Sequence, residues 1–153
     1  SLGGGCELMA FCGVVIASEK SRIGQPEMAV GVFPPVAAAW FSKIIGLKKT
    51  YELLLTGKMI SAKEAEAIGL VNVVLPVEGF KEAVDKYLAD FLKQSRPVAM
   101  WTKRAIKASL NVDFNEALKA SEVYYLDGCM NTEDANEGIS AFMEKRRAVW
   151  KDK

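Results

Sequence analysis

The hydrophobic pattern of this chain changes at Pro76, and that change limits the possible folds more than any other feature. Before Pro76, apolar runs are short and are separated by glycine or proline, as in strands and short helices joined by turns. After it, apolar residues recur at the three- and four-residue spacing of amphipathic helices. The 153 residues are therefore predicted to form two parts, an α/β part over 1–77 and an all-helical part over 78–153.

Short helices and strands are expected to alternate in the first part. Glycine stop signals and apolar patterning predict helices at 6–11, 37–46, 48–57 and 61–69. A run of small and β-branched residues predicts a strand at 14–18, and further strands are expected within 19–24, after a turn, and at 70–76. Residues 25–27 are expected to be a loop, and Ser61 and Glu64 have the spacing of a capping box. Three strands are fewer than most sheets contain, so the rest of the sheet is expected to lie outside this sequence.

Four helices are expected in the second part. The first carries an apolar stripe made by Phe80, Val84, Tyr87, Leu88 and Phe91. The second is predicted to begin near Pro97, and the third to run from Asp113 to Leu126. The fourth starts after Thr132, where the acidic residues that follow suit the positive end of a helix dipole.

Composition excludes several classes of function. The 20 Lys and Arg residues against 19 Asp and Glu give a net charge of +1, which makes no electrostatic case for nucleic acid as a partner. No apolar run reaches the ~18 residues of a membrane span. The sequence has no histidine, which removes Ser-His-Asp catalysis and most zinc sites. Its three cysteines have no metal-ligand spacing and fit a reducing compartment, so a cytoplasmic location is expected.

Three consecutive glycines at 3–5 precede Glu7 and an apolar segment. Glycine is favoured where the backbone takes an unusual φ or approaches another group closely, and Glu7 falls in the first turn of the helix that follows. The free N–H groups of such a turn could bind an anion. A second carboxylate, Glu27, follows 20 residues later. Taken singly, Glu7 could merely complement the helix dipole, Glu27 could be a surface residue, and the glycines could be a plain turn.

Three segments together resemble the enoyl-CoA hydratase/isomerase (crotonase) superfamily. They are "GGGCELMAFCGVVIASEKSRIGQPEMAVGVFP", "LLLTGKMISAKEAEAIGLVNVVLP" and "TEDANEGISAFMEKRRAVW". The resemblance covers nearly the whole chain but only the C-terminal part of a crotonase. It implies an α/β fold in which the end of a ββα spiral is followed by a helical trimerisation region. It also implies that part of the site lies outside these 153 residues, so the chain alone is expected to be inactive and to associate.

The resemblance assigns roles to residues of this sequence. The backbone N–H of Gly4 would stabilise a thioester oxyanion, Glu7 would deprotonate a water molecule, and Glu27 would protonate carbon. Having both glutamates favours a hydratase that adds water to an unsaturated acyl-CoA thioester. Double-bond isomerisation remains an alternative, as does a non-catalytic assembly module. No cofactor is implied, because CoA is part of the substrate.

One stretch departs from the family pattern. "FPPVAAAW" has Pro35 and three alanines where the family usually has glycines. The stretch looks most like cyclohexa-1,5-diene-1-carbonyl-CoA hydratases of anaerobic aromatic degradation. A stiff apolar wall for a flat ring would be made by Phe33, Pro34, Pro35 and Trp40.

The family's assembly implies further contacts. Its members form trimers and hexamers through C-terminal helices, so a homo-oligomer is expected. By resemblance, Phe142 and Lys145 would contact CoA bound to a neighbouring subunit.

Overall fold

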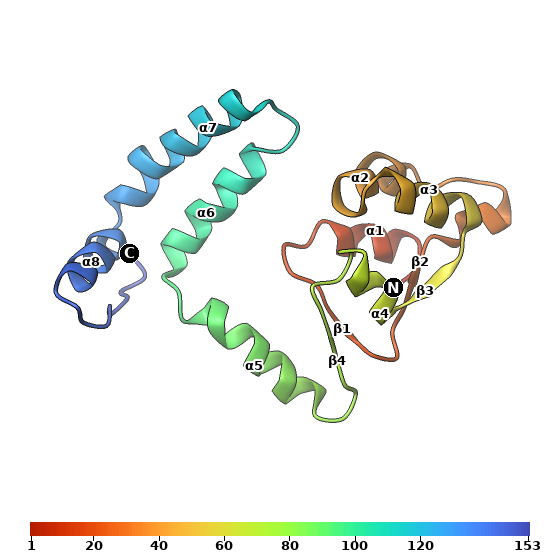
Figure 1. The fold of residues 1–153 in the computed structure, drawn as a ribbon, viewed down its shortest axis with the longest axis horizontal. Coiled ribbons are helices and arrows are strands. Elements are labelled where there is room, and N and C mark those ends of the chain that lie inside the picture. The colour runs from red at the N-terminus through yellow and green to blue at the C-terminus, as the bar shows by residue number, and fades with distance from the viewer. The chain divides into compact units, whose positions relative to one another are not determined.

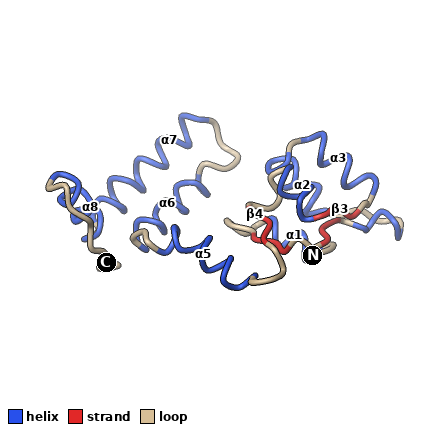
Figure 2. The backbone as a smooth tube through the Cα atoms, turned by 60° about the horizontal axis from the view of Figure 1, so that its bottom comes forward, coloured by secondary structure: helices blue, strands red, loops and turns tan.

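A computed structural model describes residues 1–153, which divide into two compact units, Ser1–Lys86 and Tyr87–Lys153. The boundary falls within helix α5, Phe80–Leu92, whereas the sequence pattern predicts a boundary between residues 77 and 78. Figure 1 traces the chain through both units; all four strands belong to the first, and strand colouring in Figure 2 appears only there. None of the helices is long and apolar enough to cross a membrane.

The first unit is an α/β structure with few strands, as the sequence indicates. Its helices are α1 (Gly4–Ala10), the 3-10 helix η1 (Pro26–Val30), α2 (Pro35–Ile45), α3 (Leu47–Thr56) and α4 (Ala62–Ala67). Its strands are β1 (Ile16–Ser18), β2 (Arg22–Gly24), β3 (Met59–Ser61) and β4 (Val73–Leu75). Two differences from the sequence expectations stand out: β3 was not predicted, and the predicted loop at 25–27 is the start of η1.

The strands form two separate pairs. β1 and β4 are parallel, with Ile16 opposite Val73, and β2 and β3 are antiparallel, with Ile23 opposite Ile60. Since β3 has three residues, of which one is buried, its pattern is too short to reveal a strand. The pairing with β2 is what defines it.

The turns follow the signals in the sequence. Ser61 accepts the N–H of Glu64 at 3.2 Å, and the Glu64 carboxylate accepts the N–H of Ser61 at 2.8 Å, so the capping box at the start of α4 is confirmed. Gly57 ends α3 with φ 62°, a left-handed conformation that glycine adopts without strain. β3 therefore follows closely on the end of α3 at Gly57 and leads directly into the start of α4 at Ser61.

One hydrophobic core supports the first unit. It draws on all four α-helices and on strands from both pairs. Its largest fully buried apolar side chains are Phe41, Ile23 and Cys6. This core fixes α1, which carries the glycine turn and Glu7, against α2.

The second unit is all-helical, as predicted. Besides the end of α5 it contains α6 (Arg96–Ala108), α7 (Phe114–Val123), the π-helix η2 (Tyr124–Gly128), the 3-10 turn η3 (Cys129–Asn131) and α8 (Glu133–Met143). The third helix was expected to continue to Leu126, but it widens into η2 after Val123. Gly128 ends η2 beneath Trp101, and a Cβ there would lie 2.8 Å from the indole ring.

Asp134 has a larger role than complementing a helix dipole. Its side chain is 1 % exposed and accepts hydrogen bonds from Ser95 Oγ at 2.6 Å and from the N–H groups of Lys151 and Asp152 at 2.7 and 3.1 Å. Burial alone would raise the pKa of Asp134, but these hydrogen bonds outweigh burial and hold that pKa below its ordinary value. The carboxylate therefore joins α6, α8 and the C-terminal segment.

Candidate active site

One backbone N–H group of the glycine turn has no hydrogen-bond partner. Gly3 donates to the carbonyl of Gly24 at 3.0 Å, and the N–H groups of Gly5, Cys6 and Glu7 all donate to carbonyls of residues 2 and 3. The N–H of Gly4, the first residue of α1, has no such partner, and Gly4 is exposed with open space where a Cβ would be. The helix begins two residues earlier than the sequence suggested, so this free donor lies inside the triple glycine.

Glu27 approaches the same turn from η1. Gly3 has φ 54° and ψ −131°, and a Cβ on it would lie 2.8 Å from Oε1 of Glu27. Glycine at position 3 thus meets two demands at once, an unusual backbone conformation and close contact with a carboxylate. The glutamate is half-buried and occupies the first turn of η1.

Gln25 fixes the position of Glu27, although nothing in the sequence alone singles it out. Gln25 is fully buried, and one end of its side-chain amide faces only acceptors: both Glu27 oxygens at 3.1 and 3.2 Å and the Gly3 carbonyl at 3.3 Å. The amide nitrogen is assigned to this side because it can donate to all three. The only available signal was an amide directly before the Pro-Glu pair, in a stretch that we expected to be a loop.

Glu7 caps a helix other than its own. Its Oε1 accepts the N–H of Ala37 at 2.9 Å, near the start of α2. α2 begins after Pro34 with Pro35, and neither proline has an N–H group or a side chain able to cap. Glu7 of α1 therefore supplies the missing cap, and the contact orients its carboxylate.

The negative charges of Glu7 and Glu27 affect the thiol of Cys6. The thiol is fully buried beneath the glycine turn. Burial raises the pKa of Cys6 to about 11, and the charges of Glu27 and Glu7 act in the same direction. Cys6 precedes Glu7 directly in α1, and Glu27 contacts Gly3 three residues before the thiol.

The four residues of the expected substrate wall have different environments. Pro34 is buried and Pro35 is exposed at the start of α2, while Phe33 is 67 % exposed. Trp40 donates its indole N–H to the carbonyl of Ala10 at 3.0 Å and stacks on Phe11 with ring centroids 5.0 Å apart. Trp40 therefore packs α2 against the end of α1.

A separate hollow of about 420 Å³ lies in the first unit, but none of the expected site residues lines it; it is bounded by β1, β2 and side chains including Met9 and Phe80. No His, Cys, Asp or Glu side chains are grouped so as to hold a metal ion.

The two expected CoA contacts lie in the second unit. Phe142 is 82 % exposed near the end of α8. Lys145 follows the helix with φ 56° and donates its N–H to the carbonyl of Phe142 at 3.2 Å. These residues thus share one turn at the end of α8.

Comparison with known proteins identifies the family. Residues 1–153 match the family described as enoyl-CoA hydratase/isomerase. The chain is 39 % identical over 155 residues to a probable enoyl-CoA hydratase of Rhizobium meliloti, covering 99 % of this chain and 59 % of that protein. It is 36 % identical over 141 residues to a short-chain-enoyl-CoA hydratase of Clostridioides difficile, covering 91 % of this chain and 90 % of that protein.

Solved structures agree. The crystal structure of an enoyl-CoA hydratase from Bacillus anthracis superposes with a TM-score of 0.91 at 32 % identity, covering 100 % of this chain and 59 % of that one. The chain spans 52–59 % of the length of the first three curated relatives. The prediction that the match falls in the C-terminal part of such proteins is not confirmed, and neither is the particular resemblance to cyclohexadiene-carbonyl-CoA hydratases. At the level of the fold and the whole sequence, however, the chain belongs to the enoyl-CoA hydratase/isomerase family.

Proposed function

We propose that this chain carries the acid–base centre of a hydratase that adds water to an unsaturated acyl-CoA thioester. The observation that supports it is the pair of glutamates held at one glycine turn. Glu27 lies against Gly3 and Gln25, and Glu7 is anchored by α2. In the same turn, the Gly4 N–H has no partner in the chain.

Each group has a defined task in this reaction. The Gly4 N–H donates to the thioester oxygen as negative charge develops on it. Glu7 takes a proton from water while the hydroxyl oxygen bonds to the β-carbon, and Glu27 gives a proton to the α-carbon. One proton is taken and one is given, so the sum is the addition of water. Gln25 acts as a positioning residue, because it contacts Glu27 and not the reacting atoms.

Isotope labelling tests the reaction. In H₂¹⁸O a hydratase places the label on carbon, whereas an isomerase moves a double bond without incorporating oxygen. Because the chain is shorter than most of its relatives, the assay is run both on these 153 residues and on a protein of the relatives' length that contains them. Double-bond migration without label in the longer protein would exclude the hydratase in favour of the isomerase.

Two substitutions test the roles in the longer protein. Glu27→Gln should lower kcat by about 10²–10⁴-fold while leaving thioester binding nearly unchanged. Gly4→Pro removes the proposed donor at a helix position that tolerates proline, and should lower kcat by ~10²–10³-fold with little loss of stability. A loss below about tenfold in either variant would remove that residue from the mechanism.

The substrate that we propose is a cyclic dienoyl-CoA. The exposed ring of Phe33 followed by two prolines supports it, since this stretch is apolar and stiff next to the residue that Glu7 caps. The test compares kcat/KM for a cyclohexadiene-carbonyl-CoA with that for a straight-chain 2-enoyl-CoA. A preference for the straight-chain substrate would reject the cyclic one without affecting the hydratase proposal.

The second candidate function is assembly without turnover by the 153-residue chain. It is favoured by the apolar side chains that α8 exposes, Phe142 at 82 % and Met143 at 74 %. Light scattering and activity are measured on the same sample. An inactive oligomer supports this candidate, whereas a monomer or measurable turnover contradicts it.

A further inference from the structure

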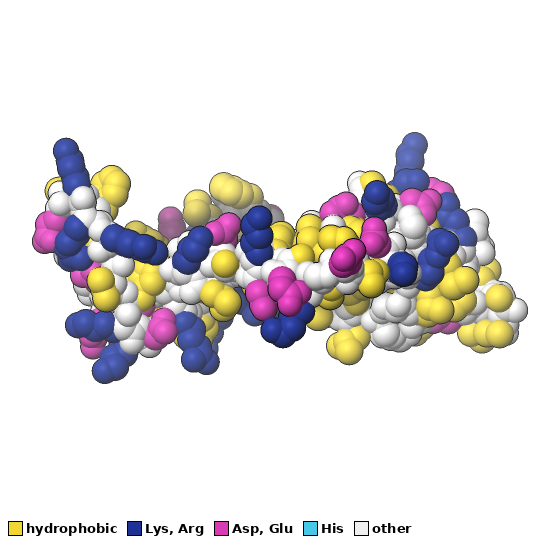
Figure 3. Space-filling model, turned by 90° about the horizontal axis from the view of Figure 1, so that it is seen from below, with side chains coloured by type: hydrophobic (Ala, Val, Ile, Leu, Met, Phe, Trp, Pro, Cys, Tyr) yellow, Lys and Arg dark blue, Asp and Glu magenta, His cyan; other side chains and the backbone are white.

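Helix α6 differs in charge from helices α5, α7 and α8. α5, α7 and α8 each place an acidic residue in the first turn, where it complements the helix dipole. α6 has no acidic residue anywhere and begins with Arg96, a cation at the positive end of the dipole. By contrast, basic and acidic side chains are interspersed on the face of the molecule in Figure 3.

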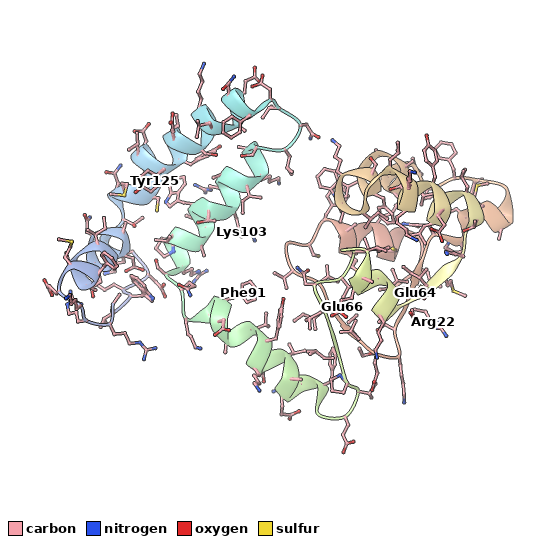
Figure 4. All side chains as sticks on the ribbon, viewed as in Figure 1. Arg22, Glu64, Glu66, Phe91, Lys103 and Tyr125 are labelled. Carbon is pink, nitrogen blue, oxygen red and sulfur yellow. The ribbon has the colours of Figure 1, made fainter.

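The basic side chains of α6 gather on one face. A hollow of about 450 Å³ is lined by Arg96, Ala99, Met100, Lys103, Arg104 and Lys107. Spacings of three and four residues place these positions on the same side of a helix, and all six are exposed. Figure 4 marks Lys103 on this helix.

None of the four cations has a carboxylate partner in the chain. Arg146 and Lys151 of the same unit form ion pairs with Glu137 and Glu133 at 2.6 and 3.4 Å. Within the basic face only Arg104 makes a charge contact, lying over the Trp101 ring at 4.5 Å. Like charges three and four residues apart repel, and no internal contact offsets that repulsion. A helix that keeps such a face gains from an anionic partner.

The apolar residues among those that line the hollow indicate which anion fits. Met100 is 43 % exposed and Ala99 is also exposed, so apolar surface adjoins the cations. A phosphate chain would use the cations but leave that surface in water, and a net charge of +1 gives the protein no general attraction for nucleic acid. α6 packs on α7 and η2, and only two of its large apolar side chains, Met100 and Ile106, are exposed, so the helix lacks the broad apolar face of a helix that inserts into a bilayer.

We propose that this face of α6 docks an acidic segment of a partner protein. Carboxylates of that segment pair with the four cations, while an apolar side chain of the segment rests on Met100 and Ala99. Charge sets the encounter and its dependence on salt, and the apolar contact distinguishes this ligand from a plain polyanion.

Calorimetric titration of the 153-residue chain tests the proposal. The probe is an acetylated 14-residue peptide of glutamate and alanine with one central leucine, and its partner probe has serine in place of leucine. The leucine peptide should bind more tightly, and raising the salt should weaken both. Lys103→Glu/Lys107→Glu should lower affinity by about tenfold or more, whereas the matched control Lys48→Glu/Lys63→Glu, in the first unit, should change it less than about twofold.

Three further measurements keep the result decisive. Met100→Asn should weaken the leucine peptide and leave the serine peptide unchanged. If the charge reversals reduce helicity, Lys103→Gln/Lys107→Gln replaces them. Equal binding by the lysine variants and the parent chain, no binding at about 1 mM peptide in low salt, or tighter binding of inorganic polyphosphate or phosphatidylserine vesicles than of the peptide would each overturn the proposal.

Discussion

Replacing Gly3 with alanine should destabilise the first unit, and the same replacement at Gly4 should not. Gly3 combines φ 54° with ψ −131°, a region that residues with a Cβ rarely enter, and its Cβ would lie 2.8 Å from Oε1 of Glu27. Gly4 is the first residue of α1, has no positive φ, and would place its Cβ in open space. Adjacent glycines in one turn thus provide their own control.

The structure gives the expected size of the difference. A side chain forced into such a backbone region costs about 1–3 kcal/mol. The contact with Glu27 adds less, because a carboxylate at the end of a flexible side chain can move. At Gly4, alanine gains up to about 1 kcal/mol from its better helix propensity. For a unit of this size each kcal/mol shifts Tm by about 4–8 °C, so the two variants should be easy to separate.

Thermal and urea unfolding followed by circular dichroism measure both variants. A third variant, Gly3→Ala in a Glu27→Ala background, separates the two contributions, since it removes the contact and leaves the backbone strain. We expect Gly3→Ala to cost somewhat less in that background and still to destabilise. If Gly3→Ala is within about 0.5 kcal/mol of Gly4→Ala, the conclusion that this turn requires glycine at position 3 is wrong.

Three further predictions concern single groups. Glu7→Ala should destabilise the first unit by ~0.5–2 kcal/mol, because α2 loses its cap. Glu7→Gln keeps an acceptor oxygen and should retain most of that stability while losing activity. Identical unfolding curves for Glu7→Ala and the parent chain would contradict the role of Glu7 as a cap. Because burial raises the pKa of Cys6 to about 11, iodoacetamide at pH 8 should modify the exposed Cys12 well before Cys6. Mass spectrometry of the digested protein measures the order of modification, and modification of Cys6 first would contradict the prediction. The pKa of Asp134 is lowered in the folded state. The stability that its carboxylate provides is therefore fully present above about pH 4, the pKa of an unfolded aspartate, and is lost as the pH falls through the lower folded pKa. Asp134→Asn should flatten this acid dependence in urea unfolding, and an unchanged pH profile would refute the prediction.

Local signals in the sequence predicted much of the fold. Glycine after an apolar segment located the ends of α2 and α3, and the Ser61–Glu64 spacing located α4. Each of these signals acts within a few residues of the chain, which is why a single sequence contains it.

Contacts between distant residues could not be predicted. β3 exists through its pairing with β2, more than thirty residues earlier in the chain. The cap that Glu7 gives to α2 joins positions 30 residues apart, and the two prolines at the start of that helix revealed only that a cap was missing. The amide of Gln25 is recognisable as a positioning group only once its burial and its three acceptors are known.

The contact between Trp40 and the end of α1 makes the fluorescence of this tryptophan a natural probe of the site. Trp40 is the only tryptophan of the first unit, and the other two, Trp101 and Trp150, belong to the second. Its indole is fixed by the Ala10 carbonyl and by the ring of Phe11, so its fluorescence depends on how α2 sits on α1. With the other two tryptophans replaced by phenylalanine, the remaining emission would follow the helix pair that holds Glu7, and ligand-induced movement there could be read without any attached dye.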